Sequence, residues 1–263
     1  MTGELSAVAV ARTIEELEEI IGGVPAERSE RQRRANLELV AELGRPEVFA
    51  PLLRSCLGDR ERLAVMAGRS YRHVNHFDKI VLADDGTGGY RLTLHLWNPP
   101  YTVKEVEDEL IHDHRFSFWS TILTGTLKSQ NFAPAESGDD GVVRLRQYRY
   151  SPEKLGAATQ SNFYEFVSEM DLAPTTVQVE EVGSAYHLEY VRIHRVLIPT
   201  EEMVCTLVLR GPRERGFSNV YNTVYPDTDT TVGNVMFTPD ELAGKLELLL
   251  AAVERRGLDA EIG

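Results

Sequence analysis

Residues 111 to 132 read IHDHRFSFWSTILTGTLKSQNF, and this stretch decides the fold that we expect for the chain. Two runs rich in apolar and β-branched residues, over 111–124 and 126–132, flank Gly125, a pattern typical of paired strands. Successive side chains of a strand point to opposite faces, so His112 and His114 can direct two imidazole nitrogens at one metal ion. Two histidines on one face also occur by chance on exposed strands, so this interpretation needs support from the rest of the chain.

The same alternation extends on both sides of this stretch. A hairpin is expected over 80–97, where three leucines at 92, 94 and 96 alternate with Arg91, Thr93, His95 and Trp97. Its two faces would therefore differ, one apolar and one polar. Further strands are expected at 142–150, 176–182, 188–197 and 204–210. Many short strands separated by turn residues favour a β-sandwich or barrel.

Helical patterns occupy the two ends of the chain. Thr13 with Glu16 and Ser29 with Gln32 open two helices, and a third apolar stripe runs from Val48 to Gly58. Near the C-terminus, Thr238 begins a helix with an apolar stripe of leucines. We therefore expect an N-terminal helical segment over 1–68 that packs on the barrel, a barrel over 69–237 and a C-terminal helix over 238–263.

Composition limits the classes of partner. The formal net charge of −13 disfavours nucleic acid and anionic membranes, because binding phosphate requires an excess of clustered Lys and Arg. The chain has two cysteines, too few for a disulfide framework, although one bridge stays open. No apolar run approaches the length of a membrane span. These features predict a reduced, cytoplasmic protein without a membrane partner.

A metal ion needs at least a third ligand, and five histidines remain: His73, His76, His95, His187 and His194. His187 and His194 are an odd number of residues apart, so one regular strand cannot direct both at the same ion. His194 lies within the β-run Tyr190–Val196 and is the choice, although a histidine in such a run is commonly a core residue. Three neutral imidazoles leave open cis positions on an octahedral ion, which suits Fe(II) binding a substrate and dioxygen side by side.

The quoted stretch resembles the first metal-binding motif of the cupin superfamily, and within it the cysteine dioxygenase-type thiol dioxygenases. The later RIHRV, residues 192–196, is similar to the strand that carries the third histidine ligand in those enzymes. The lead-in FDKIVLADDGTGGYRLTLHLW, residues 77–97, has the same hairpin rhythm and terminal Trp. The resemblance covers about residues 70 to 215. It implies a mainly β protein, a cupin-type β-barrel (double-stranded β-helix) with N-terminal helices and a C-terminal helix.

The chain departs from the family pattern at three points. Where many cupins have a glutamate ligand, it has Phe118 and Trp119, which implies an all-histidine site. Lys79 stands in place of the arginine that binds the substrate carboxylate in the family. Arg210 occupies the late strand near the position of the family's tyrosine. Lysine binds a carboxylate as a point charge without the bidentate fork of arginine, so cysteine itself is a doubtful substrate.

The resemblance implies a mononuclear non-haem iron oxygenase, a dioxygenase in which His112, His114 and His194 bind Fe(II), with Mn, Zn or Ni as alternative metals and no organic cofactor. Its substrates would be dioxygen and a small polar, amino-acid-like metabolite. On a regular strand Tyr190 and Arg192 share a face with His194, so we predict both, together with His95, as catalytic residues. Lys79 and Arg210 are predicted to bind the substrate. For each of these the alternative is a solvated or structural side chain.

Two other functions stay open at this stage. A metal-dependent cupin isomerase or lyase would work without dioxygen, and a non-catalytic ligand-binding cupin would hold a structural ion or none. Cupins commonly pair through their sheets, so the resemblance implies a homodimer as the starting expectation for oligomeric state.

Overall fold

The computed structural model describes residues 13–84, 89–136, 138, 141–151, 164–226 and 235–262, with side chains up to residue 258. Its helices are α2 (Ile14–Gly22), α3 (Glu30–Leu43), α4 (Pro46–Gly58), α5 (Arg60–Ala67), α6 (Val103–Glu107) and α7 (Pro239–Ile262). Its strands are β1 (Tyr71–Arg72), β2 (Asp78–Asp84), β3 (Arg91–Trp97), β4 (Ile111–His112), β5 (Phe118–Thr124), β6 (Leu127–Pro134), β7 (Val143–Tyr150), β8 (Tyr164–Glu180), β9 (Ala185–Leu188), β10 (His194–Leu197), β11 (Val204–Arg210) and β12 (Ser218–Asn222).

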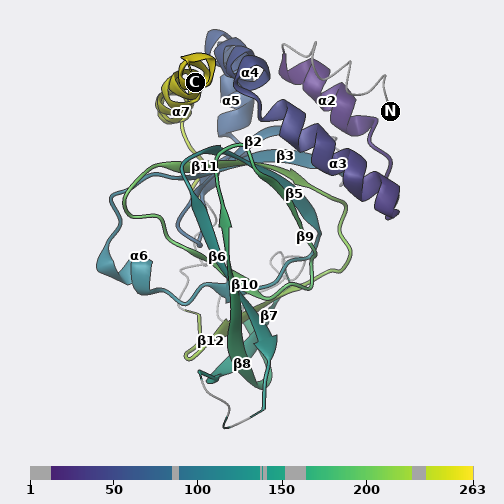
Figure 1. Ribbon diagram of the computed structural model, residues 1–263, viewed down its shortest axis with the longest axis vertical. Coiled ribbons are helices and arrows are strands. Elements are labelled where there is room, and N and C mark those ends of the chain that lie inside the picture. Colours follow the sequence, from purple (N-terminus) through teal and green to yellow (C-terminus); the bar gives the residue numbers. More distant parts are fainter. Residues whose placement is uncertain are drawn as a thin grey trace.

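The strands form two antiparallel sheets. The first has six strands in the order β1-β2-β3-β11-β5-β9, and the second closes on itself in the order β10-β4-β12-β7-β8-β6. In Figure 1 the helices α2, α3, α4, α5 and α7 cover one side of the first sheet, while β7, β8 and β12 extend from its opposite side. The expectation of a mainly β protein with helices from both ends of the chain is confirmed, and its strands form two antiparallel sheets.

The helices begin where side chains can cap them. In α2, Thr13 and Glu16 form the expected capping box, and Ser29 accepts a hydrogen bond from the Gln32 amide at the start of α3. Thr238 and Glu241 cap α7 in the same reciprocal way. Each cap satisfies amide groups that have no partner within the helix.

The largest core lies between these helices and the first sheet. The side chains of β3 and β11 that face the helices are buried against apolar residues of α2, α3, α4 and α7. They are Leu92, Leu94, Leu96, Cys205, Leu207 and Leu209. Cys56 of α4 belongs to the same core, and both cysteines are free thiols. Short helices are marginal alone in water, so the shared core is what holds them on the sheet.

The turn after β5 requires glycine. Gly125 has a φ of +67°, and a Cβ built there would lie 2.8 Å from the carbonyl oxygen of Met203. A larger residue would be strained by the backbone conformation and would clash with its neighbour. This turn carries the chain from the first sheet into the second at β6.

Three of the expected strands have other bounds. The strand expected over 111–124 is two strands, because β4 pairs in the second sheet and β5 in the first. The strand expected over 188–197 divides in the same way into β9 and β10, with a turn between them closed by a hydrogen bond from the Arg192 amide to the Glu189 carbonyl. The strand expected over 176–182 is the end of the longer β8. Residues 85–88 of the expected hairpin turn lie outside the described residues.

No helix among the described residues is both long enough and apolar enough to cross a membrane.

Candidate metal centre

His112, His114 and His194 converge at one point of the molecule. His194 opens β10 and lies directly opposite His112 of β4, so backbone pairing sets two of the three side chains beside each other. One nitrogen from each ring lies within 4.8 Å of the others, and the Nε2 atoms of His114 and His194 are 2.9 Å apart. Among the described residues these three histidines therefore form a group that could hold a metal ion.

Hydrogen bonding and burial prepare these rings as ligands. The Nδ1 of His112 lies 2.7 Å from the Leu110 carbonyl oxygen, which can only accept, so Nδ1 carries the proton and Nε2 is left for an ion. Burial lowers the pKa of His112 and lowers the pKa of His114 and His194 well below the ordinary value. All three are therefore neutral at neutral pH, and neutral imidazole is the form that binds a metal.

The donor set fits a first-row divalent ion. Three imidazole nitrogens suit zinc, iron, nickel or copper better than magnesium or calcium, which prefer oxygen ligands. The Nδ1 atom of His194 is buried without a hydrogen-bond partner among the described residues, so its ring orientation is set by packing alone.

Asp113, between His112 and His114, is buried and holds the local backbone in place through hydrogen bonds and an ion pair. Its carboxylate accepts hydrogen bonds from the amide and side chain of Asn219, at 2.6 and 2.7 Å, and forms an ion pair with Arg215. Arg215 also donates to the carbonyl oxygen of His114 at 3.0 Å. Asp113 therefore has a structural role, because these contacts fix the segment that carries both histidines.

The two inward strands next to the histidines bring further predicted residues into the interior. Lys79 of β2 and His95 of β3 are paired positions, and both are partly buried. Burial, reinforced by the positive charges of Arg91, Arg210 and Arg115, lowers the pKa of Lys79 to about 8. Burial also holds the pKa of His95 well below its ordinary value, with Lys79 contributing. Lys79 can therefore change protonation state closer to neutral pH than an exposed lysine, whereas His95 stays neutral there.

Arg210 is buried at the end of β11. It donates to the Gly89 carbonyl oxygen at 2.6 Å, and its guanidinium lies 5.4 Å from the centre of the Phe116 ring. It lies opposite Arg91, so two arginines occupy neighbouring positions on the inward side of the sheet. The structure thus places the predicted substrate-binding pair, Lys79 and Arg210, in one positively charged part of the interior.

Tyr190 and Arg192 lie in the turn between β9 and β10, so the expectation of a regular strand there was wrong. Tyr190 packs under the Arg215 guanidinium at 5.3 Å, and Arg192 is exposed. The argument that put both on the face of His194 does not hold for a turn, although the charge of Arg192 helps to lower the pKa of His194. Their catalytic role stays a prediction without that support.

The choice of His194 over His187 agrees with the geometry. His187 stacks on Trp119, with ring centres 5.0 Å apart, and Trp119 belongs to the core under the helices. His187 is therefore on the helix-covered side of the first sheet, away from the three-histidine group. The odd spacing does not explain this placement, because the turn after Leu188 interrupts the regular strand on which that argument depends.

A turn that borders the metal centre, residues 73–77 between β1 and β2, was not predicted from the sequence. Its Asn75 side-chain nitrogen lies 3.5 Å from Nε2 of His112. His73 stacks on Phe77 at 4.5 Å, and Phe77 stacks on His95 at 4.3 Å. No pattern marks this turn, because a single Asn between two histidines in a polar segment has many ordinary roles.

Comparisons with known proteins give only distant likenesses. No protein-family model matches the chain, and no curated protein matches it. Among solved structures, one reported under DMSP lyases RdDddP and RnDddQII is 16% identical, with 54% of this chain and 50% of that chain covered and a TM-score of 0.28. A protein of unknown function with a cupin-like fold from Ralstonia eutropha is 12% identical, with 74% and 80% covered and a TM-score of 0.27. Ectoine synthase from P. lautus is 9% identical, with 66% and 96% covered and a TM-score of 0.23. The match spans half of the lyase chain, and likenesses at this level say nothing about the activity of this protein.

Proposed function

We propose that the protein is a mononuclear non-haem iron oxygenase of the cupin type that acts with dioxygen on a small, anionic, amino-acid-like metabolite. The observation that carries the proposal is the convergence of three neutral nitrogen donors, from the buried His194 and the partly buried His112 and His114. Bound Fe(II) would supply the activation of dioxygen that no side chain can supply. Three protein ligands leave coordination positions for more than one small molecule.

The protein's own residues would bind and orient the substrate. Lys79 and Arg210 supply positive charge in the interior, and a substrate carboxylate would be attracted to both. His95 is neutral, and its Nε2 lies 3.4 Å from the Thr93 hydroxyl oxygen. Its ring would donate a hydrogen bond to a polar group of the substrate or accept one from it. The aromatic rings of Phe77 and Trp97 beside it would exclude water from the reacting centre.

A metal-dependent isomerase or lyase is the second candidate, and one observation favours it. The pKa of Lys79 is lowered to about 8, so this amine in the interior is suited to giving and taking a proton near neutral pH. Such a reaction would use the same metal centre without consuming dioxygen. A ligand-binding cupin without catalysis is the third, and it would keep its ligand affinity when the metal is removed.

Metal analysis tests the proposal directly. Protein purified without chelator or affinity metal would be analysed by elemental mass spectrometry as wild type, His194→Ala and His187→Ala. We expect near-stoichiometric iron in the wild type and His187→Ala, because His187 stacks on Trp119 away from the group, and loss of iron in His194→Ala. Oxygen uptake with amino-acid, thiol and amine substrates would then separate the oxygenase from the isomerase. Absence of bound metal in wild type, with none taken up anaerobically, would refute the metal centre.

A further inference from the structure

The turn over residues 73–77 is held in one shape by its own hydrogen bonds. The His73 amide donates to the Phe77 carbonyl at 2.8 Å, and the His76 amide donates to the His73 carbonyl at 3.0 Å. The Asn75 amide donates to Nδ1 of His73 at 3.1 Å. His76 adopts a φ of 60°, a left-handed conformation that is uncommon outside glycine. These hydrogen bonds within residues 73–77 fix the position of the Asn75 backbone and so restrict where its side chain can point.

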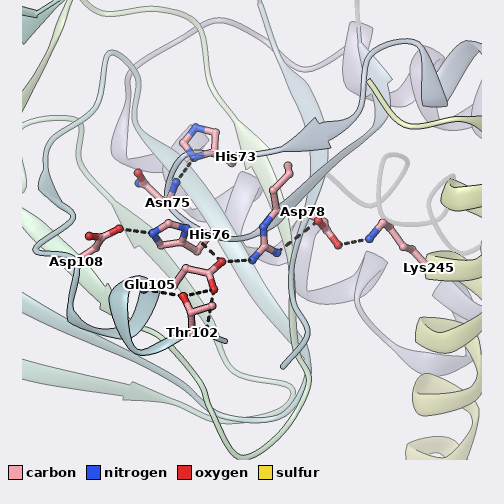
Figure 2. A network of polar contacts seen from close by, with 9 residues as sticks. His73, Asn75, His76, Asp78, Thr102, Glu105, Asp108 and Lys245 are labelled. Atoms are coloured by element: carbon pink, nitrogen blue, oxygen red, sulfur yellow. Dashed lines mark hydrogen bonds and ion pairs between the residues drawn. The ribbon is translucent and has the colours of Figure 1, made fainter. Parts of the chain in front are cut away.

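A chain of charged side chains holds the turn from outside, as Figure 2 shows. His76 contacts Asp108 at 2.6 Å through Nε2 and Glu105 at 3.7 Å through Nδ1. Glu105 lies 3.4 Å from Arg72, which lies 3.5 Å from Asp78. Asp78 in turn pairs with Lys245 of α7 at 2.7 Å, so the chain of contacts links the turn to the C-terminal helix.

The Asn75 amide faces the nitrogen of His112 that is left for an ion. Its Nδ2 atom lies 3.5 Å from His112 Nε2, whereas Nδ1 of the same ring is occupied by Leu110. Two ligands bound cis at about 2.1 Å from one ion are separated by about 3 Å, close to this distance. The nitrogen and oxygen of an amide exchange places by a simple flip, so the oxygen can occupy the same point.

We propose that Asn75 is a fourth protein ligand of the metal centre, binding the ion through its side-chain amide oxygen. This inference rests on the metal centre proposed above and adds a residue that the histidine pattern does not contain. An amide oxygen is a hard ligand, and it shifts the preference of an all-nitrogen site toward iron(II) or manganese(II). Four protein ligands leave two positions on an octahedral ion, one for the substrate and one for dioxygen.

Cobalt(II) provides a test that does not depend on activity. Wild type, Asn75→Ala, Asn75→Asp, His194→Ala and the control Asn98→Ala would be titrated with Co(II) alone by calorimetry and visible absorption. Asn98 is exposed on the loop after β3, so its replacement should leave both measurements unchanged. We expect Asn75→Ala to bind Co(II) about tenfold to a hundredfold more weakly, with stronger visible absorption as the coordination number falls. Asn75→Asp should bind at least as tightly as wild type, because a carboxylate oxygen replaces the amide oxygen.

The possible outcomes separate the two proposals. If His194→Ala loses Co(II) while Asn75→Ala keeps the affinity and spectrum of the wild type, the metal centre stands and the role of Asn75 is refuted. If Asn75→Ala does not fold, Asn75→Asp decides, since Co(II) binding weaker than that of the wild type would refute a ligand oxygen at this position. If wild type binds no Co(II), both proposals fail.

Discussion

The two faces of the strands β3 and β11 differ in almost every respect although their residues alternate along the same backbone. One face is made of leucines and Cys205, fully buried under the helices. The other carries polar residues, Thr93, His95, Thr206 and Arg210, and the apolar Trp97, Val204 and Val208 into the interior. Because side chains of a strand alternate, a shift of register by one residue would exchange the two faces. Within each of these strands, the residues that pack against the helices therefore alternate with the residues that we predict to contact a ligand.

Two ionisable residues on the inward face, Lys79 and His95, are held in surroundings that disfavour their charged forms. Burial lowers the pKa of Lys79 and of His95, so the protein interior opposes the charged form of both. A core selected for stability alone would replace these groups with apolar ones. Their presence is explained if they serve the binding or conversion of a ligand.

The largest effect is expected from a substitution on the helix-covered face alone. Leu207→Ala should lower the free energy of unfolding by about 3 to 5 kcal/mol, because it leaves a cavity in the largest core. The neighbouring Thr206→Val, on the inward face, should cost far less. Urea unfolding measures both, and Co(II) titration of the folded protein should give one site in each. A stable Leu207→Ala protein without a metal site would show that the faces are not independent.

Two neighbouring residues at the end of β4, His112 and Asp113, show the same contrast between binding a metal and stabilising the fold. Asp113→Ala should lower the free energy of unfolding by about 3 kcal/mol, because it leaves the Arg215 charge without its buried partner. Its neighbour His112→Ala should instead remove the metal and leave the unfolding of the metal-free protein nearly unchanged. Chemical unfolding in the presence of a chelator compares the two. Equal loss of stability in both variants would contradict the division of roles.

The smallest effect concerns the pH dependence of stability. Lys79 binds its proton less tightly in the folded state, with a pKa of about 8, than in the unfolded chain, so stability should rise as pH increases from about 8 to about 10.5. Lys79→Met should reduce this rise by about 2 kcal/mol, allowing for the partial exposure of Lys79. Unfolding free energies of both proteins at pH 7 and pH 10 measure the difference. An identical rise in the variant would mean that Lys79 is not held in a desolvated place.

Local sequence signals predicted the parts of this molecule that local interactions determine. The caps at Thr13, Ser29 and Thr238 depend on side chains within three residues of each other, and each is present in the structure. The leucine alternation of β3 likewise gave the correct faces. The grouping of His194, and not His187, with His112 and His114 agrees with the prediction, but the parity argument behind it does not apply, because a turn separates His187 from His194 and they lie in different sheets.

Other features depend on contacts between distant segments, and no single stretch contains them. The apolar run at 111–124 does not show that the chain leaves one sheet after His112 and enters the other at Phe118. The turn after Leu188, which removes Tyr190 and Arg192 from a strand, is equally invisible in the alternation. Much of β8 is exposed on both faces, so it lacks the apolar alternation that would predict its full length. Asn75 meets His112 only because the turn and β4 are adjacent in space.

The two buried thiols can report how often the helices separate from the first sheet. Cys56 and Cys205 both lie in the core between the helices and the first sheet, and burial raises the pKa of Cys56 to about 12. Neither is reactive while that layer is closed, because the thiolate is the reactive form and no reagent reaches it. The rate at which an aromatic disulfide reagent modifies them therefore measures how often the helices lift from the sheet. The same experiment with and without a bound ion would show whether the metal centre, on the far side of those strands, changes that frequency.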